Sequence, residues 1–371
     1  MKRCIYHYPL PFNYTKPNGS AVRPIYMLEA FKDCGYIVDA ITGYGKERKK
    51  KIREIKERIL NGVKYDFVYS ESLTQPTLLS EKNHFPKYPN LDFGFLKFCR
   101  HYDIPVGLFY RDMHWKFKQF KEIVPWYKRL ILVPFYRYDL YKYKRCVDIL
   151  YCANKKIANY GVKHENLKEL PPGCKKNDEI IYKKMIKEKT NSVLNVFYVG
   201  GIAGIYDIST FLEGMRNNGK VYLTVCTPEE HWVNNKERVS NLLNNRVNVI
   251  HEKSDGLAEY YLKADTALFC KKEDPYTDLA SPIKAKETLG YGTPIIVSDN
   301  LHIAKEVVEG DYGWVVKAES QDISELLDYL CKNPDEISKK TKNAIKAAEN
   351  NTWKKRAEQV INDMKRIKVT N

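Results

Sequence analysis

The 371-residue sequence lacks a long apolar run, a cysteine pairing motif and an export signal. No stretch approaches the ~20 consecutive apolar residues that span a bilayer. The N-terminal MKRCIYHYPLPF has only a short apolar run, broken by proline, and no small-residue cleavage site. The nine cysteines are an odd number without a C-x-x-C pair, which argues against a disulfide framework or a zinc site. These absences predict a cytoplasmic location.

What the chain does contain is a globular composition with a large excess of positive charge. Apolar residues make up 43% and charged residues 29% of the sequence, as in folded domains. The length suits two domains of roughly 150 to 200 residues each. The formal net charge of +16 implies an anionic partner, which could be nucleic acid, a phosphate-bearing ligand or an acidic membrane surface.

The positive charge is concentrated in residues 113–145, MHWKFKQFKEIVPWYKRLILVPFYRYDLYKYKR. This stretch holds nine Lys or Arg, two acidic residues and ten aromatic residues. Rings and cations together suit the headgroup zone of an acidic membrane, although the same mixture could bind single-stranded nucleic acid or form a solvated helix over a core-facing aromatic stripe. Because no RNA-binding or helix-turn-helix signature accompanies it, we predict a membrane surface as its partner, and not nucleic acid.

Strands and helices alternate along the chain in two successive runs. The first includes the strands YDFVYSES and IPVGLFYRD, and the second restarts at LNVFYVGG. This alternation predicts parallel sheets covered on both faces, and therefore an α/β chain with two Rossmann-like domains. The polar segment CKKNDEIIYKKMIKEKTNS between the runs is expected to be a flexible linker, and KERVSNLLNN is expected to be a helix.

In open α/β sheets, ligands bind beyond the carboxyl ends of the strands. Gly19-Ser20 lies ahead of a helix after the first strand, and Gly200-Gly201 follows the strand LNVFYV. Both turns could hold an anion or be plain turns. Because neither has the G-x-G-x-x-G spacing, a dinucleotide-dependent oxidoreductase is disfavoured.

A further candidate is the pair Lys284 and Glu287 in SPIKAKETLGYGTPIIVSDN, residues 281–300. The stretch is typical of a helix, a glycine turn and a buried strand, and its Ser-Pro fixes where the helix begins. The two charged residues are three apart and share one face of that helix. They are therefore either solvated surface charges or part of a ligand site.

These features together resemble the GT-B glycosyltransferases, especially the large group 1-like family (family 4) that builds bacterial surface polysaccharides. The likeness rests on Gly19-Ser20, on YVGGIAG and above all on S-P-x-K-x-x-E-x-x-x-x-G-x-P from Ser281 to Pro294. It extends to NTWKKRAEQVINDMKRI, which is similar to the helix that crosses back to the first domain. The resemblance implies two Rossmann-like domains facing across a cleft. Residues 1–172 with helix 355–371 would bind the acceptor, and residues 173–354 the nucleotide sugar.

In that family, the lysine of the motif would hold the donor diphosphate and the glutamate would bind the ribose hydroxyls. The implied donor-binding residues are Gly200, Gly201, Ser281, Pro282, Lys284 and Glu287. The cations that usually follow the glycine turn are missing, so Lys284 carries more of the phosphate charge, with Lys271 or Lys272 as a second candidate. The second glutamate of many retaining members is also missing, since Leu279 occupies its position. Retention or inversion therefore stays open.

On the acceptor side, the resemblance points to the loop RDMHW after the strand IPVGLFY. Arg111 occupies the position where family members often carry histidine, and Asp112 follows it. Asp112 is the first candidate for the base or acceptor-orienting group and His114 the second, although Arg111 and Asp112 could equally form a structural pair. The candidates for an acceptor or phosphate loop are Gly19, Ser20, Arg23 and Glu71.

The predicted function is transfer of a sugar from a nucleotide sugar, a UDP-sugar by preference, to a lipid-linked or polysaccharide acceptor in capsule or exopolysaccharide synthesis. The enzyme would lie peripherally at the inner face of the membrane. No D-x-D pair occurs in the sequence, so neither a metal ion nor another cofactor is expected. Two alternatives stay open: a catalytically silent GT-B-like subunit that supports another enzyme, and a sugar-nucleotide epimerase, which the basic aromatic stretch disfavours.

Overall fold

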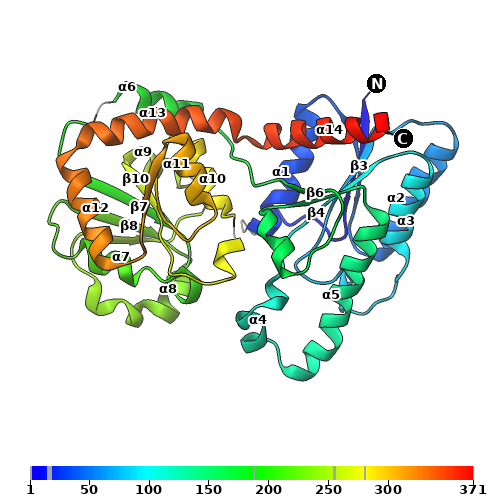
Figure 1. The fold of residues 1–371 in the computed structure, drawn as a ribbon, viewed down its shortest axis with the longest axis horizontal. Coiled ribbons are helices and arrows are strands. Elements are labelled where there is room, and N and C mark those ends of the chain that lie inside the picture. The colour runs from blue at the N-terminus through cyan, green and yellow to red at the C-terminus, as the bar shows by residue number, and fades with distance from the viewer. Residues whose placement is uncertain (1, 15–18, 188, 254–255, 280, 371) are drawn as a thin grey trace. The chain divides into compact units, whose positions relative to one another are not determined.

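The computed structural model describes residues 2–14, 19–187, 189–253, 256–279 and 281–370. The chain forms two compact units, one of residues 1–171 and 353–371 and the other of residues 172–352 (Figure 1). Each unit contains one six-stranded sheet in which every strand pairing is parallel. The predicted pair of Rossmann-like α/β domains is confirmed.

The first unit is built on the strand order β2-β1-β3-β4-β5-β6. Its strands are β1 (Arg3–Tyr8), β2 (Ile37–Thr42), β3 (Phe67–Glu71), β4 (Val106–Tyr110), β5 (Ile149–Cys152) and β6 (Leu167–Glu169). Its α-helices are α1 (Gly19–Asp33), α2 (Gly45–Leu60), α3 (Leu91–His101), α4 (Lys118–Ile123), α5 (Trp126–Cys146) and α14 (Trp353–Thr370). Its 3₁₀ turns are η1 (Thr77–Leu79), η2 (His114–Lys116) and η3 (Lys155–Tyr160).

Helix α14 returns to the first unit after the whole second unit, as the resemblance implied. Trp353, Val360 and Met364 are buried in one cluster with Tyr6 of β1. The approach is close: a Cβ at Gly107 of β4 would lie 2.1 Å from the Met364 Cε. A side chain at that position would have to push the Met364 methyl group and the Tyr151 ring aside, so the last helix packs directly on β4 and completes the core of the first unit.

The loops at the carboxyl edge of the first sheet are held by one buried arginine, Arg48 of α2, which is 1% exposed. Its guanidinium donates to both carboxylate oxygens of Asp92, at 2.9 and 3.1 Å, and to the carbonyls of Pro9 (3.0 Å) and Gly43 (2.7 Å). A fifth bond reaches the Ser80 Oγ at 2.8 Å. Arg48 thus joins the loops that follow β1, β2 and β3.

The second unit has the strand order β12-β11-β10-β7-β8-β9. Its strands are β7 (Leu194–Val199), β8 (Val221–Cys226), β9 (Val247–Ile250), β10 (Thr266–Phe269), β11 (Ile295–Ser298) and β12 (Gly313–Val316). Its α-helices are α6 (Asp178–Ile186), α7 (Ser209–Met215), α8 (Glu229–Asn235), α9 (Ala258–Lys263), α10 (Ile283–Gly290), α11 (Ile303–Gly310), α12 (Ser320–Lys332) and α13 (Pro334–Asn350). Its 3₁₀ turns include η4 (Gly204–Tyr206), η5 (Lys236–Arg238), η6 (Ser240–Leu242) and η8 (Thr277–Leu279).

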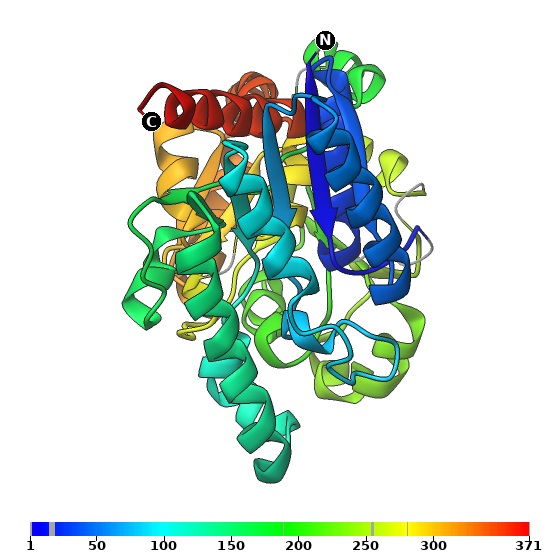
Figure 2. The ribbon, with the colours of Figure 1, turned by 90° about the vertical axis from the view of Figure 1, so that its right-hand side faces the viewer.

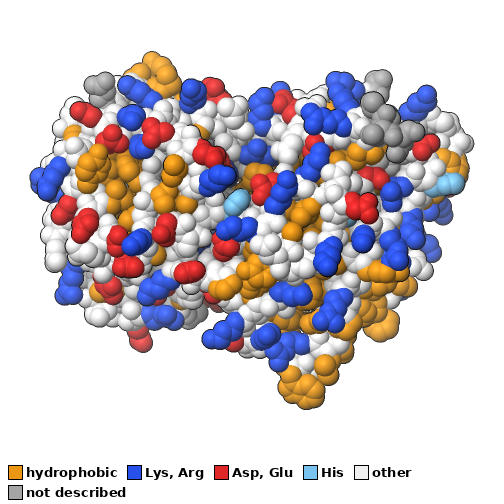
Figure 3. All heavy atoms as spheres, in the orientation of Figure 1, with side chains coloured by type: hydrophobic (Ala, Val, Ile, Leu, Met, Phe, Trp, Pro, Cys, Tyr) orange, Lys and Arg blue, Asp and Glu red, His pale blue; other side chains and the backbone are white. Residues whose placement is uncertain are grey.

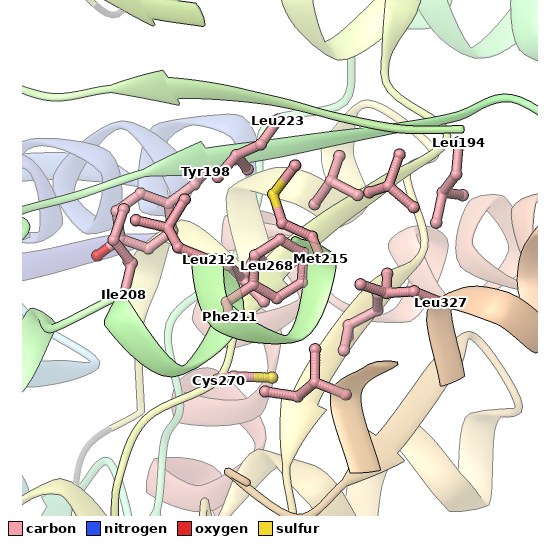
Figure 4. Close-up of a cluster of buried hydrophobic side chains, with 14 of the residues drawn as sticks. Leu194, Tyr198, Ile208, Phe211, Leu212, Met215, Leu223, Leu268, Cys270 and Leu327 are labelled. Atoms are coloured by element: carbon pink, nitrogen blue, oxygen red, sulfur yellow. The ribbon is translucent and has the colours of Figure 1, made fainter. Parts of the chain in front are cut away.

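Both faces of the second sheet are covered because its strands are apolar on both sides. Leu268 and Cys270 point into the cluster formed with α7 and α12 (Figure 4). Ala267 and Phe269, one residue out of phase, point into the opposite cluster with α10, α11 and α13. This alternation is the period of two expected of a strand that is buried on both faces.

Two local predictions were wrong. The expected linker contains α6, because the Asn177 side chain caps its first turn by accepting from the Ile180 N–H at 3.1 Å, and Ile180 and Ile181 are buried. The expected helix at 236–245 is replaced by the short turns η5 and η6, and the α-helix, α8, lies before them.

Candidate functional site

The second sheet reverses its strand order between β7 and β10, which are neighbours. Connections from the first strand of such a sheet run to one side and later ones to the other, which opens a crevice at the carboxyl ends. Gly200 and Gly201 follow β7 and Lys271 follows β10 by two residues. The predicted glycine turn and the predicted second lysine therefore meet at the crevice.

The glycine turn is tightly packed. The Tyr198 hydroxyl donates to the Gly201 carbonyl at 2.5 Å, and a Cβ at Gly200 would lie 2.7 Å from that hydroxyl. A Cβ at Gly201 would lie 3.1 Å from the His231 Cε1. A side chain at either position would have to displace the Tyr198 hydroxyl or the His231 ring, so glycine is the residue that fits this turn without rearrangement.

Lys271 is fixed at the crevice by its backbone. Its N–H donates to the Ser298 Oγ (2.9 Å), and that hydroxyl donates to the Lys271 carbonyl (3.0 Å). The ammonium lies 4.4 Å from the centre of the Tyr206 ring, a cation–π contact. Burial lowers the pKa of Lys271 to about 8 because a charged amine loses hydration there. A nearby anion would stabilise the charged form.

His231 and Tyr206 were missed by the sequence reasoning. His231 lies on α8, which begins shortly after β8 ends, and its Nδ1 is buried without a hydrogen-bond partner in the described part of the chain. Tyr206 lies in η4 behind the glycine turn. Position after a strand was the one available signal for both, and many other loop residues share it.

Lys284 and Glu287 lie on α10, which begins at Ile283 directly after Pro282, with Ser281 just before. The Lys284 Nζ lies 2.7 Å from the Glu287 Oε2, and the two side chains are 31% and 22% exposed. Both charges are thus half-buried and neutralise each other.

The other lysine of the same helix has a different environment. Lys286 is buried and bonds to Glu306 of α11 and to the Asn351 Oδ1. It fixes α10 to its neighbours in the second unit. Of the two lysines on α10, Lys284 is the one that is half-exposed and placed to meet a ligand.

Three predicted residues of the first unit come together in a buried ion cluster. Glu71 is fully buried at the end of β3, with its Oε1 3.3 Å from the Arg23 Nε and its Oε2 3.1 Å from the Arg111 Nη2. Arg23 also stacks at 3.4 Å over the Phe109 ring. Because both oxygens of Glu71 face guanidinium groups, its carboxylate is placed to balance charge.

The other two residues of the predicted acceptor loop, Asp112 and His114, also lie together. The Asp112 Oδ1 accepts from the His114 N–H at 3.0 Å, and the Asp112 Oδ2 lies 3.8 Å from the His114 Nδ1. The imidazole packs edge-on against Phe120 and Tyr136, and burial lowers the pKa of His114 while Asp112 opposes this. The two side chains are equally exposed, at 24% each, so exposure does not separate the two candidates.

Gly19 and Ser20 are the first residues of α1; the Ser20 side chain lies outside the described part of the structure. Over the described ranges, no group of three or more His, Cys, Asp or Glu side chains could hold a metal ion. No helix within those ranges is long and apolar enough to cross a membrane.

Comparisons with known proteins agree with this arrangement. Residues 179–351 match the family model described as glycosyl transferases group 1, whereas none of the curated proteins matches the sequence. The fold is similar to that of sucrose-phosphate synthase from Thermosynechococcus elongatus, with a TM-score of 0.66 at 13% identity over 100% of both chains.

Two further solved structures are similar over nearly the whole chain. Anabaena HepE in complex with UDP and glucose has a TM-score of 0.62 at 12% identity, over 97% of this chain and 99% of that chain. The α,α-trehalose 6-phosphate synthase of Burkholderia multivorans has a TM-score of 0.58 at 11% identity over 100% of both. This match and these similar structures confirm the predicted GT-B fold and the prediction of a glycosyltransferase.

Proposed function

We propose that this glycosyltransferase moves a sugar from a UDP-sugar to a lipid-linked or polysaccharide acceptor in the synthesis of a cell-surface glycan. The observation that carries the proposal is the pairing of Lys284 with Glu287 at 2.7 Å on α10, within the matched domain. One cation and one carboxylate side by side suit a nucleoside diphosphate, whose phosphates need positive charge and whose ribose hydroxyls need acceptors.

The donor would lie along the crevice of the second unit. Lys284 would hold the diphosphate and Glu287 the ribose, so their mutual ion pair is exchanged for contacts with the ligand. The glycine turn at 200–201 and Lys271 would supply further contacts to the phosphates. The complex of Anabaena HepE with UDP and glucose supports UDP as the nucleotide.

Glycosyl transfer needs the leaving diphosphate to be neutralised and, with inversion, a base for the acceptor hydroxyl. Lys284 and Lys271 would neutralise the diphosphate without a metal ion. Asp112 would accept the proton from the acceptor, with His114 holding it in place. Arg111 would have no part in the proton transfer. Its guanidinium donates to Glu71 and would place a positive charge beside the acceptor.

We place the enzyme peripherally at the inner face of the membrane through α4 and α5, residues 118–146, which are named here the α4–α5 arm. Figures 1 and 2 show the arm extending beyond the sheet of the first unit. Near its tip, Ile123, Trp126 and Leu130 are 80%, 66% and 67% exposed, and basic side chains surround apolar ones there (Figure 3). Tyr136 and Tyr143, nearer the end of α5, are buried.

Different parts of the arm thus fit two of the interpretations of its sequence. The end of α5 packs on the core, whereas the tip exposes apolar and basic side chains that suit an acidic bilayer. Changing Trp126 and Leu130 to serine should reduce sedimentation with vesicles of acidic phospholipid severalfold, with vesicles of neutral lipid as the comparison. Unchanged sedimentation would count against this part of the proposal.

The donor site is tested by calorimetric titration with UDP, GDP and ADP. We expect UDP to bind best and Lys284→Ala to weaken it by about 10- to 100-fold, since a charge-assisted contact contributes about 1.5–3 kcal/mol. Lys305→Ala is the matched control, because Lys305 also pairs with a glutamate along its helix, Glu309 at 3.7 Å. If no nucleotide binds, the proposal fails.

A further inference from the structure

A cavity of about 610 Å³ in the first unit is lined by residues of that unit between Tyr8 and Arg111. The first sheet reverses its strand order between β1 and β3, so its ligand crevice is expected at the carboxyl ends of those two strands. The lining includes Tyr8 at the end of β1, residues 10–14 after it, Tyr44 after β2, residues 73–75 after β3 and Arg111 after β4. The volume lies within the range of small-molecule sites.

Aromatic rings make up much of the lining. Tyr8 and Phe12 are stacked, with ring centres 5.8 Å apart and planes 11° from parallel. Tyr14 meets Phe12 edge-on at 6.1 Å and is 75% exposed, and Tyr44 lines another side. Exposed ring faces carry negative partial charge and attract polarised C–H groups, such as those on the faces of a sugar ring.

The charge at the base of this cavity is positive. Arg111 lines it, and behind Arg111 lie Glu71 and Arg23. Two guanidinium groups share one carboxylate, so the three side chains sum to one positive charge. None of the described residues that line the cavity is acidic. This positive charge favours an anionic group on the ligand.

The walls are already fixed. Arg48 holds the loops at Pro9 and Gly43 through their carbonyls. The Tyr136 hydroxyl of α5 donates to the Thr74 carbonyl at 3.0 Å, and Asp139 of α5 accepts from the Thr77 N–H at 2.8 Å. A site held by buried bonds on both sides needs little ordering when a ligand enters.

We propose that this cavity binds the acceptor and that the acceptor carries a sugar ring with an anionic group. The ring would stack on Tyr14 and Phe12, and the anionic group would bind Arg111. Thr74 and Thr77 are hydrogen-bonded to α5. An acceptor at the membrane would therefore bind against a loop that is attached to the α4–α5 arm. This inference rests on the proposed function, because only glycosyl transfer makes the ligand an acceptor. Binding of the ligand itself can be measured without a donor.

Ligand-observed NMR with three probes tests it: methyl glucoside, methyl glucuronide and glucose 6-phosphate. We expect at least one anionic probe to bind tenfold or more tightly than the neutral one. The carboxylate and phosphate probes distinguish a uronate from a sugar phosphate as the anionic unit. Equal binding of all three, or no binding at all, would overturn the proposal.

Two variants locate the binding. Tyr14→Ala should weaken the preferred probe at least fivefold, whereas Tyr329→Ala, which removes an exposed ring on α12 (46% exposed), should leave it unchanged. Arg111→Gln should bring the anionic probes to the level of the neutral one, with circular dichroism reporting that the fold is kept. Unchanged binding in Tyr14→Ala would refute the assignment of the cavity.

Titration of the same protein with UDP separates the two proposals. If the protein binds UDP but none of the probes, the proposed function stands and the proposal that the cavity binds the acceptor is refuted. Probe binding that Tyr14→Ala removes, in a protein that binds no nucleotide, would support the cavity while the proposed function fails.

Discussion

The protonation of Lys271 gives a test of the donor site, because it should change when UDP binds. Its ammonium lies at the crevice of the second unit, over the Tyr206 ring, and burial lowers its pKa from 10.5 to about 8. That shift corresponds to about 3 kcal/mol of lost hydration. A bound diphosphate would replace the missing hydration with an opposite charge and raise the pKa again. UDP binding is therefore expected to take up a proton at mildly alkaline pH.

The size of the effect follows from the pKa. With a pKa of about 8, roughly nine-tenths of Lys271 is charged at pH 7 and roughly one-tenth at pH 9. If only the ammonium binds phosphate, the Kd for UDP should rise about tenfold between these pH values, which is about 1.4 kcal/mol. The phosphates contribute little to this change, since their last pKa lies near 6. Lys271→Met should bind more weakly at pH 7 and lose this pH dependence.

Calorimetry of UDP binding at pH 7 and pH 9, in two buffers with different ionisation enthalpies, measures both the Kd and the protons taken up. Lys272→Met, a change at the exposed neighbour, should keep the tenfold change. A wild-type Kd that is the same at both pH values, or a Lys271→Met protein that keeps the slope, would refute a role for Lys271 at the diphosphate.

Two further predictions concern the stability of the first unit. Burial raises the pKa of Asp139 from 3.8 to about 7, so the native state keeps a proton that the unfolded chain has lost, and this contribution to stability declines as pH rises from about 4 to 7. Urea unfolding of the wild type should show that the free energy of unfolding falls by at most about 4 kcal/mol between pH 4 and pH 7. Asp139→Asn should lack this fall; the same dependence on pH in both proteins would contradict the prediction. Arg48→Met should lower the free energy of unfolding by about 3–5 kcal/mol because it leaves Asp92 buried without its guanidinium, whereas Arg53→Met on the exposed face of α2 should cost under 1 kcal/mol; similar losses in both would contradict the role of Arg48.

The architecture was predictable because it depends on local pattern. Buried parallel strands are short apolar runs, and the repeated alternation with helices admits few other folds. The spacing of Lys284 and Glu287 is also local, since three residues within one helix determine that the side chains meet. Helix α6 was missed because its two buried isoleucines, Ile180 and Ile181, lie in a segment, residues 174–192, that holds six lysines.

The sites of the first unit needed the strand order. Glu71 meets Arg111 across 40 residues of sequence because β3 and β4 are neighbours, and Arg23 reaches the same carboxylate from α1. The ring of Tyr8 comes from the end of β1 and those of Phe12 and Tyr44 from the loops after β1 and β2, which the pairing of β1 with β2 brings together. From the sequence alone, Tyr8 is predicted to lie within a strand and Phe12 at the end of that strand.

The path of the chain also has a consequence for biosynthesis. The first unit is interrupted after residue 171 and resumes at residue 353, where Trp353, Val360 and Met364 enter its core. During translation the second unit can fold as soon as its own residues emerge, but the first must wait with an open apolar face until α14 has been made. The unit whose chain begins first therefore completes its core last, once α14 has emerged.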